Sequence, residues 1–405
     1  MTASGPAAPT AGALMHFPSL RLHNRVLPVL IAAGVAAVFG SGFLSIAPNR
    51  LLSGRPVALW AAADSTLIVT IVVCGALLLT VAFMPLHRAT YRAAAVVAAL
   101  LFLAILAAAG QGAAALAAGA PALARVSLDA GFWVLFGAAG LALIDALQRA
   151  ETGIAARLCV AAAVAVAFVA MAEAGLFDAL SLAREYHTRR DFFASAMVRH
   201  ILLVVAAVGP AVAIGFPLGV AAARRPQMQG PLFAVLNLLQ TIPSVALFGL
   251  LIVPLSALAT AVPALAAIGV GGIGPAPAII ALILYALLPV VRNSAAGIGG
   301  VDPTVLDAGR GMGLTPRQLF WRAELPLAAP VLLAGLRIVI VQAIGLAVVA
   351  ALIGAGGLGS LIFEGLGQYA ADLVLLGALP AILLALMADF LLQTLAALLN
   401  RRFGR

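Results

Sequence analysis

Residues that could do chemistry are few in this sequence, and five charged ones follow Asp302 in one polar segment, residues 297–326. They are Asp307, Arg310, Arg317, Arg322 and Glu324. Interleaved acids and arginines on a projecting segment suit contacts with a partner protein, because such side chains form strong charge-assisted hydrogen bonds. A solvated helical loop is the alternative interpretation.

The first part of this segment predicts a short helix. Asp302 before Pro303 is typical of an N-cap followed by proline at the first helical position. The helix is expected to reach Met312, where Gly313 supplies a residue able to end it. We therefore expect a corner at Gly313.

The second part predicts another short helix. Thr315, Pro316 and Gln318 match a capping box with proline at the first helical position. Leu325 precedes Pro326, which predicts that this helix ends there as the chain returns to its apolar surroundings. The whole segment is thus expected to form two short helices joined at a glycine corner.

Prolines interrupt two of the long apolar runs. Pro243 and Pro289 predict broken helices, which membrane proteins tolerate where neighbouring helices or a water-filled cavity satisfy the backbone. A translocation path and simple helix kinks are both consistent with this pattern. The residues expected to border such a path are Gln240, Thr241, Pro243, Ser244, Tyr285 and Pro289.

Asp389 is the deepest acid in the apolar part of the sequence. An intramembrane carboxylate can belong to a proton relay, so Asp389 favours an ion- or proton-coupled secondary transporter as the alternative function. A proton relay through the membrane uses several such groups, and Asp389 is only one.

Signals for catalysis, metal binding and nucleotide binding are missing from the sequence. It contains no lysine, so the phosphate-binding loop GxxxxGK[ST] is not present. Cys74 and Cys159 fall inside apolar runs, and the five histidines form no ligand pair. We expect no catalytic residue, no bound metal or cofactor and no nucleic-acid partner.

Long apolar helices must position these residues. The 405-residue chain is 64% hydrophobic and only 9% charged, which excludes an ordinary soluble protein. A helix needs about 20 mostly apolar residues to cross a membrane, and this length marks ten candidates in two groups of five. The first group is 26–47, 65–84, 93–109, 130–147 and 157–176. The second group is 201–222, 231–251, 277–291, 328–351 and 373–399. We predict an all-α membrane protein.

Arginine predicts the orientation and the domain organisation. With the N-terminus in the cytoplasm, fifteen arginines fall inside and seven outside, so both termini are expected to be cytoplasmic. The predicted regions are a cytoplasmic N-terminal segment, a five-span region, an external interfacial linker, a second membrane region and a cytoplasmic tail. Their bounds are 1–25, 26–176, 177–199, 200–399 and 400–405.

The polar segment resembles the EAA loop of ABC importer permeases. That pattern is Glu-Ala-Ala, three residues, Gly, nine residues, Ile, any residue, Leu-Pro. The matching positions are Asp307, Ala308, Gly309, Gly313, Ala323, Glu324, Leu325 and Pro326. The spacing is complete, while Asp307, Gly309 and Ala323 replace the glutamate, the second alanine and the isoleucine.

Five further stretches look like the permease subunits of glycine betaine and other osmoprotectant importers. They are 240–251, 286–293, 308–315, 324–337 and 351–359. The resemblance covers about residues 198–399 and implies a five-helix type I importer core in a bacterial inner membrane. It also implies coupling to separate ATPase subunits that use ATP and Mg²⁺, a second permease copy or sibling, lipid surroundings and an extracytoplasmic solute-binding protein. The first five spans are an extension of that core.

Overall fold

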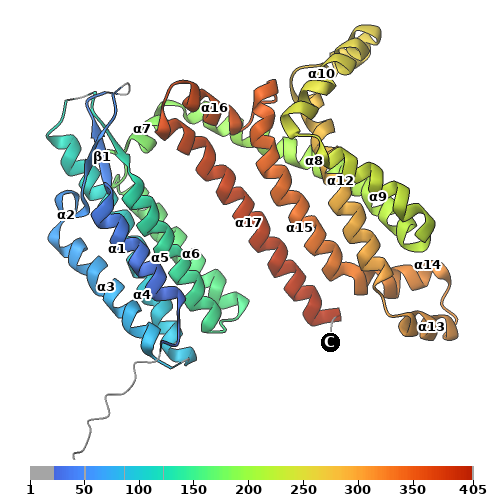
Figure 1. Ribbon diagram of the computed structural model, residues 1–405, viewed down its shortest axis with the longest axis horizontal. Coiled ribbons are helices and arrows are strands. Elements are labelled where there is room, and N and C mark those ends of the chain that lie inside the picture. The colour runs from blue at the N-terminus through green and yellow to red at the C-terminus, as the bar shows by residue number, and fades with distance from the viewer. Residues whose placement is uncertain (1–21, 50–51, 86, 122, 404–405) are drawn as a thin grey trace, which may run out of the picture. The chain divides into compact units, whose positions relative to one another are not determined.

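The computed structural model describes residues 22–49, 52–85, 87–121 and 123–403. The chain folds into two compact units, one of residues 1–48 with 53–179 and the other of residues 49–52 with 180–405 (Figure 1). Most of the predicted N-terminal segment, residues 1–25, and the last two residues of the predicted tail lie outside the described residues. Each unit is described by itself.

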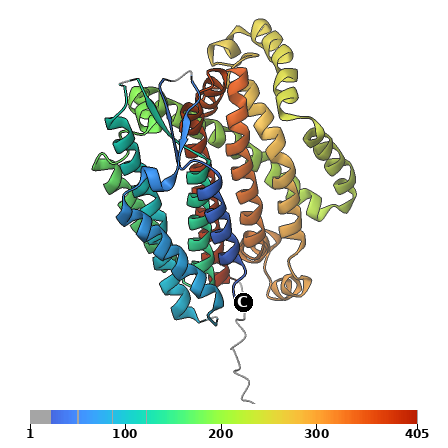
Figure 2. The same ribbon diagram turned by 60° about the vertical axis from the view of Figure 1, so that its left-hand side comes forward.

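The described residues of unit 1 form six helices and three short strands. The helices are α1 (Val26–Gly40), α2 (Leu59–Ala62), α3 (Ser65–Phe83), α4 (Arg88–Ala118), α5 (Ala130–Arg149) and α6 (Ile154–Glu173). The strands are β1 (Leu44–Ala47), β2 (Arg55–Val57) and β3 (Arg125–Leu128). They form an antiparallel sheet in the order β2-β1-β3, in which Leu44 pairs with both Val57 and Leu128 (Figure 2).

The sheet corrects the first predicted span, 26–47. Helix α1 ends at Gly40, and the last four residues of the predicted span form β1 instead. The chain between them passes close to its neighbours, because a Cβ atom at Gly42 would lie 2.3 Å from Oδ2 of Asp129. Glycine therefore allows the turn from α1 into the sheet, and α1 keeps only 15 residues.

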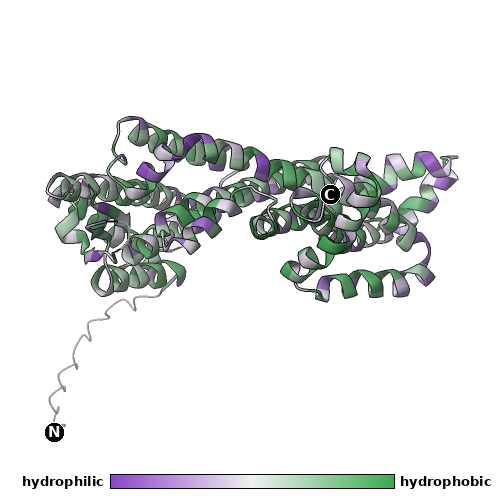
Figure 3. Cartoon of the chain, turned by 90° about the horizontal axis from the view of Figure 1, so that it is seen from above, coloured by the Kyte–Doolittle hydropathy of each residue, from purple (hydrophilic) through white to green (hydrophobic). Residues whose placement is uncertain are grey.

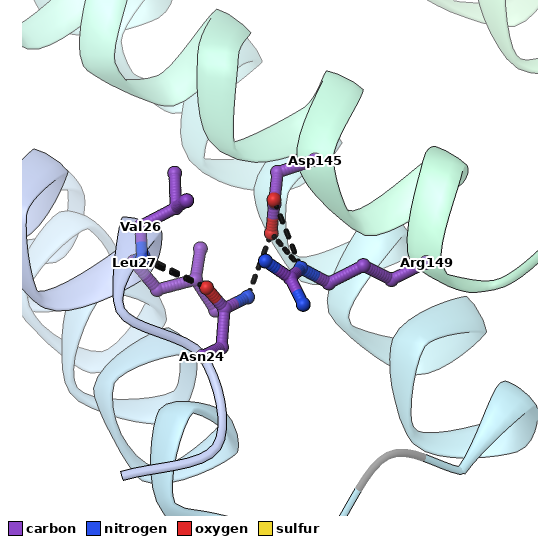
Figure 4. A network of polar contacts seen from close by, with 5 residues as sticks. All are labelled: Asn24, Val26, Leu27, Asp145 and Arg149. Carbon is purple, nitrogen blue, oxygen red and sulfur yellow. Dashed lines mark hydrogen bonds and ion pairs between the residues drawn. The ribbon is translucent and has the colours of Figure 1, made fainter.

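A polar network ties the start of α1 to α5 at the end of unit 1 opposite the sheet (Figure 4). The Asn24 amide donates to Oδ2 of Asp145 at 2.7 Å, and Nε of Arg149 donates to Oδ1 of the same carboxylate at 2.9 Å. The Asn24 side-chain oxygen accepts from the backbone N–H of Val26 at 2.9 Å. Asp145 is thus a structural acid that holds the first helix in place.

The described residues of unit 2 form helices joined by short connections, and none of them forms a strand. Its elements are α7 (Ser181–Thr188), α8 (Arg190–Arg224), α9 (Pro226–Thr241), α10 (Ser244–Ala261), α11 (Pro263–Ala267), α12 (Pro275–Gly299), α13 (Pro303–Gly311), α14 (Pro316–Leu319), a π-helical turn (Phe320–Glu324), α15 (Leu325–Val349), a 3₁₀ turn (Ala350–Ile353), α16 (Gly359–Gly367) and α17 (Ala371–Phe403).

The core of unit 2 lies where α12 packs between α8 and α15. Two glycines one helical turn apart allow α8 to approach α12 closely. A Cβ atom at Gly215 would lie 2.7 Å from Cγ1 of Val290, and one at Gly219 would lie 2.4 Å from Cβ of Ser294. Small residues at this spacing let two membrane helices meet backbone to backbone.

Nine helices in the described part of the chain are long and apolar enough to cross a membrane, and α1 is a shorter apolar helix. Hydrophobic residues make up most of the helices (Figure 3). The protein is therefore a multi-pass, predominantly helical membrane protein. The seventh predicted span, 231–251, is not one helix, because the chain breaks at Ile242–Pro243 between α9 and α10. The eighth span is unbroken, because α12 continues through Pro289.

The predicted external linker, 177–199, contains only one separate short helix, α7. Residues from Arg190 onward already belong to α8, which is 35 residues long. Glu185 of α7 is buried, and Arg189 lies between it and Glu364 of α16, with a 2.7 Å contact to Glu364. This ion-pair network fixes α7 against α16.

Candidate functional site

The first short helix of the polar segment, α13, has the predicted ends. The Asp302 carboxylate accepts from the Thr304 hydroxyl and from the Thr304 backbone N–H, both at 2.8 Å. These two hydrogen bonds hold the pKa of Asp302 below its ordinary value. At the other end Gly313 has a φ of +80°, a left-handed conformation that favours glycine.

The second short helix, α14, begins at the predicted capping box. The Thr315 hydroxyl accepts from the backbone N–H of Gln318 at 3.3 Å, and the Gln318 side chain accepts from the backbone N–H of Thr315 at 2.9 Å. Two otherwise unpaired backbone donors are satisfied in this way. The prediction of two helices around a glycine corner is confirmed.

Gly309 permits the two short helices to pack together. It is buried, and a Cβ atom there would lie 2.6 Å from Cδ1 of Leu319 and 3.4 Å from Cδ1 of Leu314. Leu319 is itself buried beneath α13. The glycine that departs from the Glu-Ala-Ala pattern is therefore needed for close approach within this segment.

The outer surface of the segment combines charge with exposed apolar side chains. Asp307 pairs with Arg310 at 2.6 Å, and their side chains are 71% and 62% exposed. Ala308 is exposed beside them. Met312 is 76% exposed and Trp321 is 58% exposed. We define these five residues as the handle surface, and α13, α14 and the π-helical turn that carry it as the handle. Sequence reasoning missed Met312 and Trp321, although a large apolar residue within a polar segment is a signal for a protein contact.

The predicted helix end at Leu325 is wrong. The helix continues from α14 through the π-helical turn into α15, and the backbone N–H of Leu325 bonds to the carbonyl of Phe320, five residues earlier. Proline lacks an N–H and clashes with the preceding turn of an α-helix. A locally wider π turn before Pro326 accommodates both effects and keeps the helix continuous.

Glu324 is anchored within unit 2. Its buried carboxylate accepts from Nη2 of Arg224 at 3.1 Å, and the Arg224 guanidinium lies 5.4 Å from the centre of the Phe320 ring. Arg224 is the last residue of α8, so the pair ties that helix end to the π turn. Sequence reasoning did not identify Arg224, because the partners are 100 residues apart.

The break between α9 and α10 is held against α12. The Gln240 side chain donates to the backbone carbonyl of Tyr285 at 2.8 Å, and the Tyr285 hydroxyl donates to the backbone carbonyl of Ile242. Gln240 and Tyr285 are thus brought together from the predicted path residues. Pro243 has extended ψ at the break itself.

The other predicted path residues lie around this break or beyond it. The Thr241 hydroxyl bonds back to the carbonyl of Leu238 at 2.7 Å, and Ser244 begins α10. Pro289 lies further along α12, where its carbonyl accepts from the Asn293 amide at 2.8 Å. It takes no part in the break.

Two protein families match this chain, one over most of unit 1 and the other over most of unit 2. Residues 215–405 match the family described as the binding-protein-dependent transport system inner membrane component, and residues 23–183 match the N-terminal domain of the ABC transporter permease YehY. The osmoprotectant import permease protein OsmW of Salmonella typhimurium is 41% identical over 52% of this chain and 92% of its own length.

This chain belongs to the family of ABC importer permeases.

Two other relatives of the permease agree with this assignment. The carnitine transport permease protein OpuCB of Listeria monocytogenes is 41% identical over 49% of this chain and 83% of its own. The choline transport system permease protein OpuBB of Bacillus subtilis is 39% identical over 48% of this chain and 82% of its own length. A chain of the inward-facing MetNI methionine ABC transporter has a TM-score of 0.46 and 21% identity, covering 52% of this chain and 98% of that chain.

The permease holds Asp389 in an ion pair. Both oxygens of the carboxylate contact Arg337 of α15, and Nη2 of Arg337 lies 3.0 Å from Oδ2. Among the described residues no group of three or more histidines, cysteines, aspartates or glutamates is placed to hold a metal ion. Nothing in the structure or in the comparisons supports the alternative of a secondary transporter.

Proposed function

We propose that this permease is the membrane subunit of an ATP-driven importer of small compatible solutes, with glycine betaine, choline or a related quaternary amine as substrate. The relatives described above are permease proteins for osmoprotectants, carnitine and choline, and they support this solute class. A solute-binding protein delivers the substrate from outside, and the permease pairs with a second copy or a sibling in the lipid bilayer.

The observation that carries the proposal is the handle surface on α13, α14 and the π turn. Capping, the Gly309 contact and the Arg224–Glu324 pair fix these elements firmly to unit 2, while Asp307 and Met312 remain exposed. A rigid base with an exposed mixed charged and apolar face suits a contact that must transmit movement. We propose that a separate ATPase subunit grips it.

Within this account the chain itself does not hydrolyse ATP. ATP and Mg²⁺ bind to the ATPase partner, and closing of two ATPase subunits pulls the handle surfaces of two permeases. The continuous π turn is important here, because it connects the handle directly to α15 and so to the core of unit 2. Movement of the handle is thereby converted into a change between outward-open and inward-open states.

The arginines support a cytoplasmic position for the handle. In unit 2, the end of α8 that carries Arg224 and Arg225 contacts the π turn through the Arg224–Glu324 pair, and α12, which carries Arg292, leads directly into α13. The C-terminal end of α17 lies at the same end of the unit as α13 and α14 (Figure 1). Arginine accumulates in cytoplasmic connections. We propose that this end faces the cytoplasm and that both chain termini do as well.

Reconstitution tests this function. The full chain is placed in proteoliposomes together with its ATPase and solute-binding protein, and uptake of radiolabelled glycine betaine and choline is measured. We expect uptake of at least one solute that requires ATP and persists when ionophores collapse the ion gradients. Uptake that survives ATP depletion but stops with the gradient would contradict the proposal.

A further inference from the structure

An ion pair lies deep in the apolar part of unit 2. Nη2 of Arg337 donates to Oδ2 of Asp389 at 3.0 Å, and its Nε donates to the other carboxylate oxygen. At 1.5 Å per residue, Arg337 lies about 18 Å from either end of α15. This places the pair near the middle of the hydrocarbon layer, whereas Arg224–Glu324 lies at a helix end.

Neither charged side chain is enclosed by its own unit. The Arg337 side chain is 39% exposed and the Asp389 side chain is 27% exposed. Charged groups at this depth are costly when they face lipid, and in membrane proteins they face the protein interior or a water-filled cavity. A permease must open such a cavity, so the exposed sides of this pair are best satisfied if they border it.

We propose that Arg337 and Asp389 form a solute-binding site in the transport path for zwitterions that carry a carboxylate and a quaternary ammonium group. This inference rests on the proposed function of the permease. The guanidinium has a planar set of donors that matches a carboxylate in two-point contact. The carboxylate of Asp389 supplies the opposite charge for the cationic end of the solute.

Exchange of partners keeps every charge paired. While the path is empty, Arg337 and Asp389 neutralise one another; when a zwitterion enters, its carboxylate takes Arg337 and its cation takes Asp389. When the solute leaves, the protein pair forms again. No charge is left alone at low dielectric, which would be costly, and the solute is held weakly enough to leave. The Gln393 amide donates to Oδ2 of Asp389 at 3.1 Å and positions that carboxylate during the exchange.

The ratio of uptake of two solutes tests the site, because a general defect in folding or assembly lowers both uptakes together. The reconstituted importer described above is supplied with glycine betaine, a zwitterion, and with choline, a cation that lacks the carboxylate. The variants are Arg337→Gln and Arg337→Lys. Arg224→Gln serves as the matched control, because it removes an arginine from another ion pair that joins two helical elements of unit 2, at a helix end rather than at the middle of α15.

We expect Arg337→Gln to lower the betaine-to-choline uptake ratio at least about tenfold, since a charged hydrogen-bond partner of the betaine carboxylate is lost. Arg337→Lys should recover part of the ratio, and Arg224→Gln should leave it within about twofold of wild type. If the wild type imports both solutes and Arg337→Gln leaves the betaine-to-choline uptake ratio unchanged, the solute-binding site is overturned while the proposed function stands. The ion pair would then only hold α15 and α17 together. Failure of the wild type to import either solute with ATP would overturn the proposed function, and this inference with it.

Discussion

Gly309 in α13 lies so close to Leu319 in α14 that a Cβ atom at Gly309 would sit 2.6 Å from Cδ1 of the leucine. The two short helices of the handle therefore share one small packed contact rather than projecting independently. Because the handle is otherwise exposed, this contact decides whether Asp307 and Met312 keep their relative positions. A rigid handle is what transmission of force from an ATPase requires.

Gly309→Val should weaken the complex with the ATPase at least about tenfold, because the added side chain forces α13 away from Leu319. Gly311→Val is the matched control, since Gly311 lies in the same helix with no atom near its Cβ position and makes the same change of residue type, with the same change in helix propensity. Affinity of the detergent-purified permease for the ATPase is the measurement. Equal weakening by both variants would show that the packed contact is unimportant.

Gly313→Val should uncouple ATP hydrolysis from solute binding while membrane insertion remains normal. The left-handed φ of +80° costs a β-branched residue about 1–2 kcal/mol, so the corner between α13 and α14 would rearrange. Gly313→Asn should have a smaller effect, because asparagine tolerates this conformation. The measurement is the stimulation of ATPase activity by the loaded solute-binding protein, which should be greatest in the wild type, smaller in Gly313→Asn and smallest in Gly313→Val. Equal stimulation of the Gly313→Val variant and the wild type would contradict this prediction.

The Arg224–Glu324 pair should show a measurable coupling energy. We expect about 1 kcal/mol from a double-mutant cycle with alanine substitutions, because the carboxylate is buried but the arginine is half exposed. The exposed Arg310–Asp307 pair provides the comparison and should give about zero. Apparent unfolding temperatures of the four proteins in each cycle supply the data. A larger coupling for the exposed pair would be inconsistent with the anchoring role of Glu324.

The cap of α13 should be sensitive to acid only. Because hydrogen bonds lower the pKa of Asp302 in the folded protein, its contribution is fully present above the unfolded pKa of about 3.9 and is lost as the pH falls through the folded value. Hydrogen exchange of the backbone around Thr304, corrected for intrinsic rates, should be constant between about pH 5 and 8 and less protected in stronger acid. Asp302→Asn keeps a capping residue without the charge and should lack the acid-dependent step. A step near neutral pH would argue against Asp302 as its origin.

Capping and turn motifs within a few residues predicted the structure of the handle well. They could not predict contacts between residues far apart in the sequence. The N-cap at Asp302, the left-handed Gly313 and the Thr315 capping box depend on neighbours within a few residues, so the order of residues is enough to find them. Arg337 and Asp389 are 52 residues apart, and no periodicity indicates their pairing.

An apolar run of residues does not by itself decide between a helix and a strand, or between a broken and a continuous helix. Residues 44–47 continue the apolar pattern of α1 but form β1, because pairing with β2 and β3 satisfies their backbone. Pro243 ends a helix whereas Pro289 does not, although both lie in apolar surroundings. At Pro326 a π turn relieves the proline within a continuous helix, an outcome decided by hydrogen bonding that residue types alone do not specify.

Chemical cross-linking tests whether the ATPase subunit grips the handle. In a background lacking Cys74 and Cys159, Met312→Cys places one thiol on the handle surface, and Ile268→Cys places a control thiol on the exposed connection at the opposite end of unit 2. We expect a short thiol-to-amine cross-linker to join the Met312→Cys protein to the ATPase in reconstituted complexes and to leave the Ile268→Cys protein without a link to the ATPase. Cross-linking at residue 268 instead, or labelling of residue 312 by an impermeant reagent from the outer face, would contradict it.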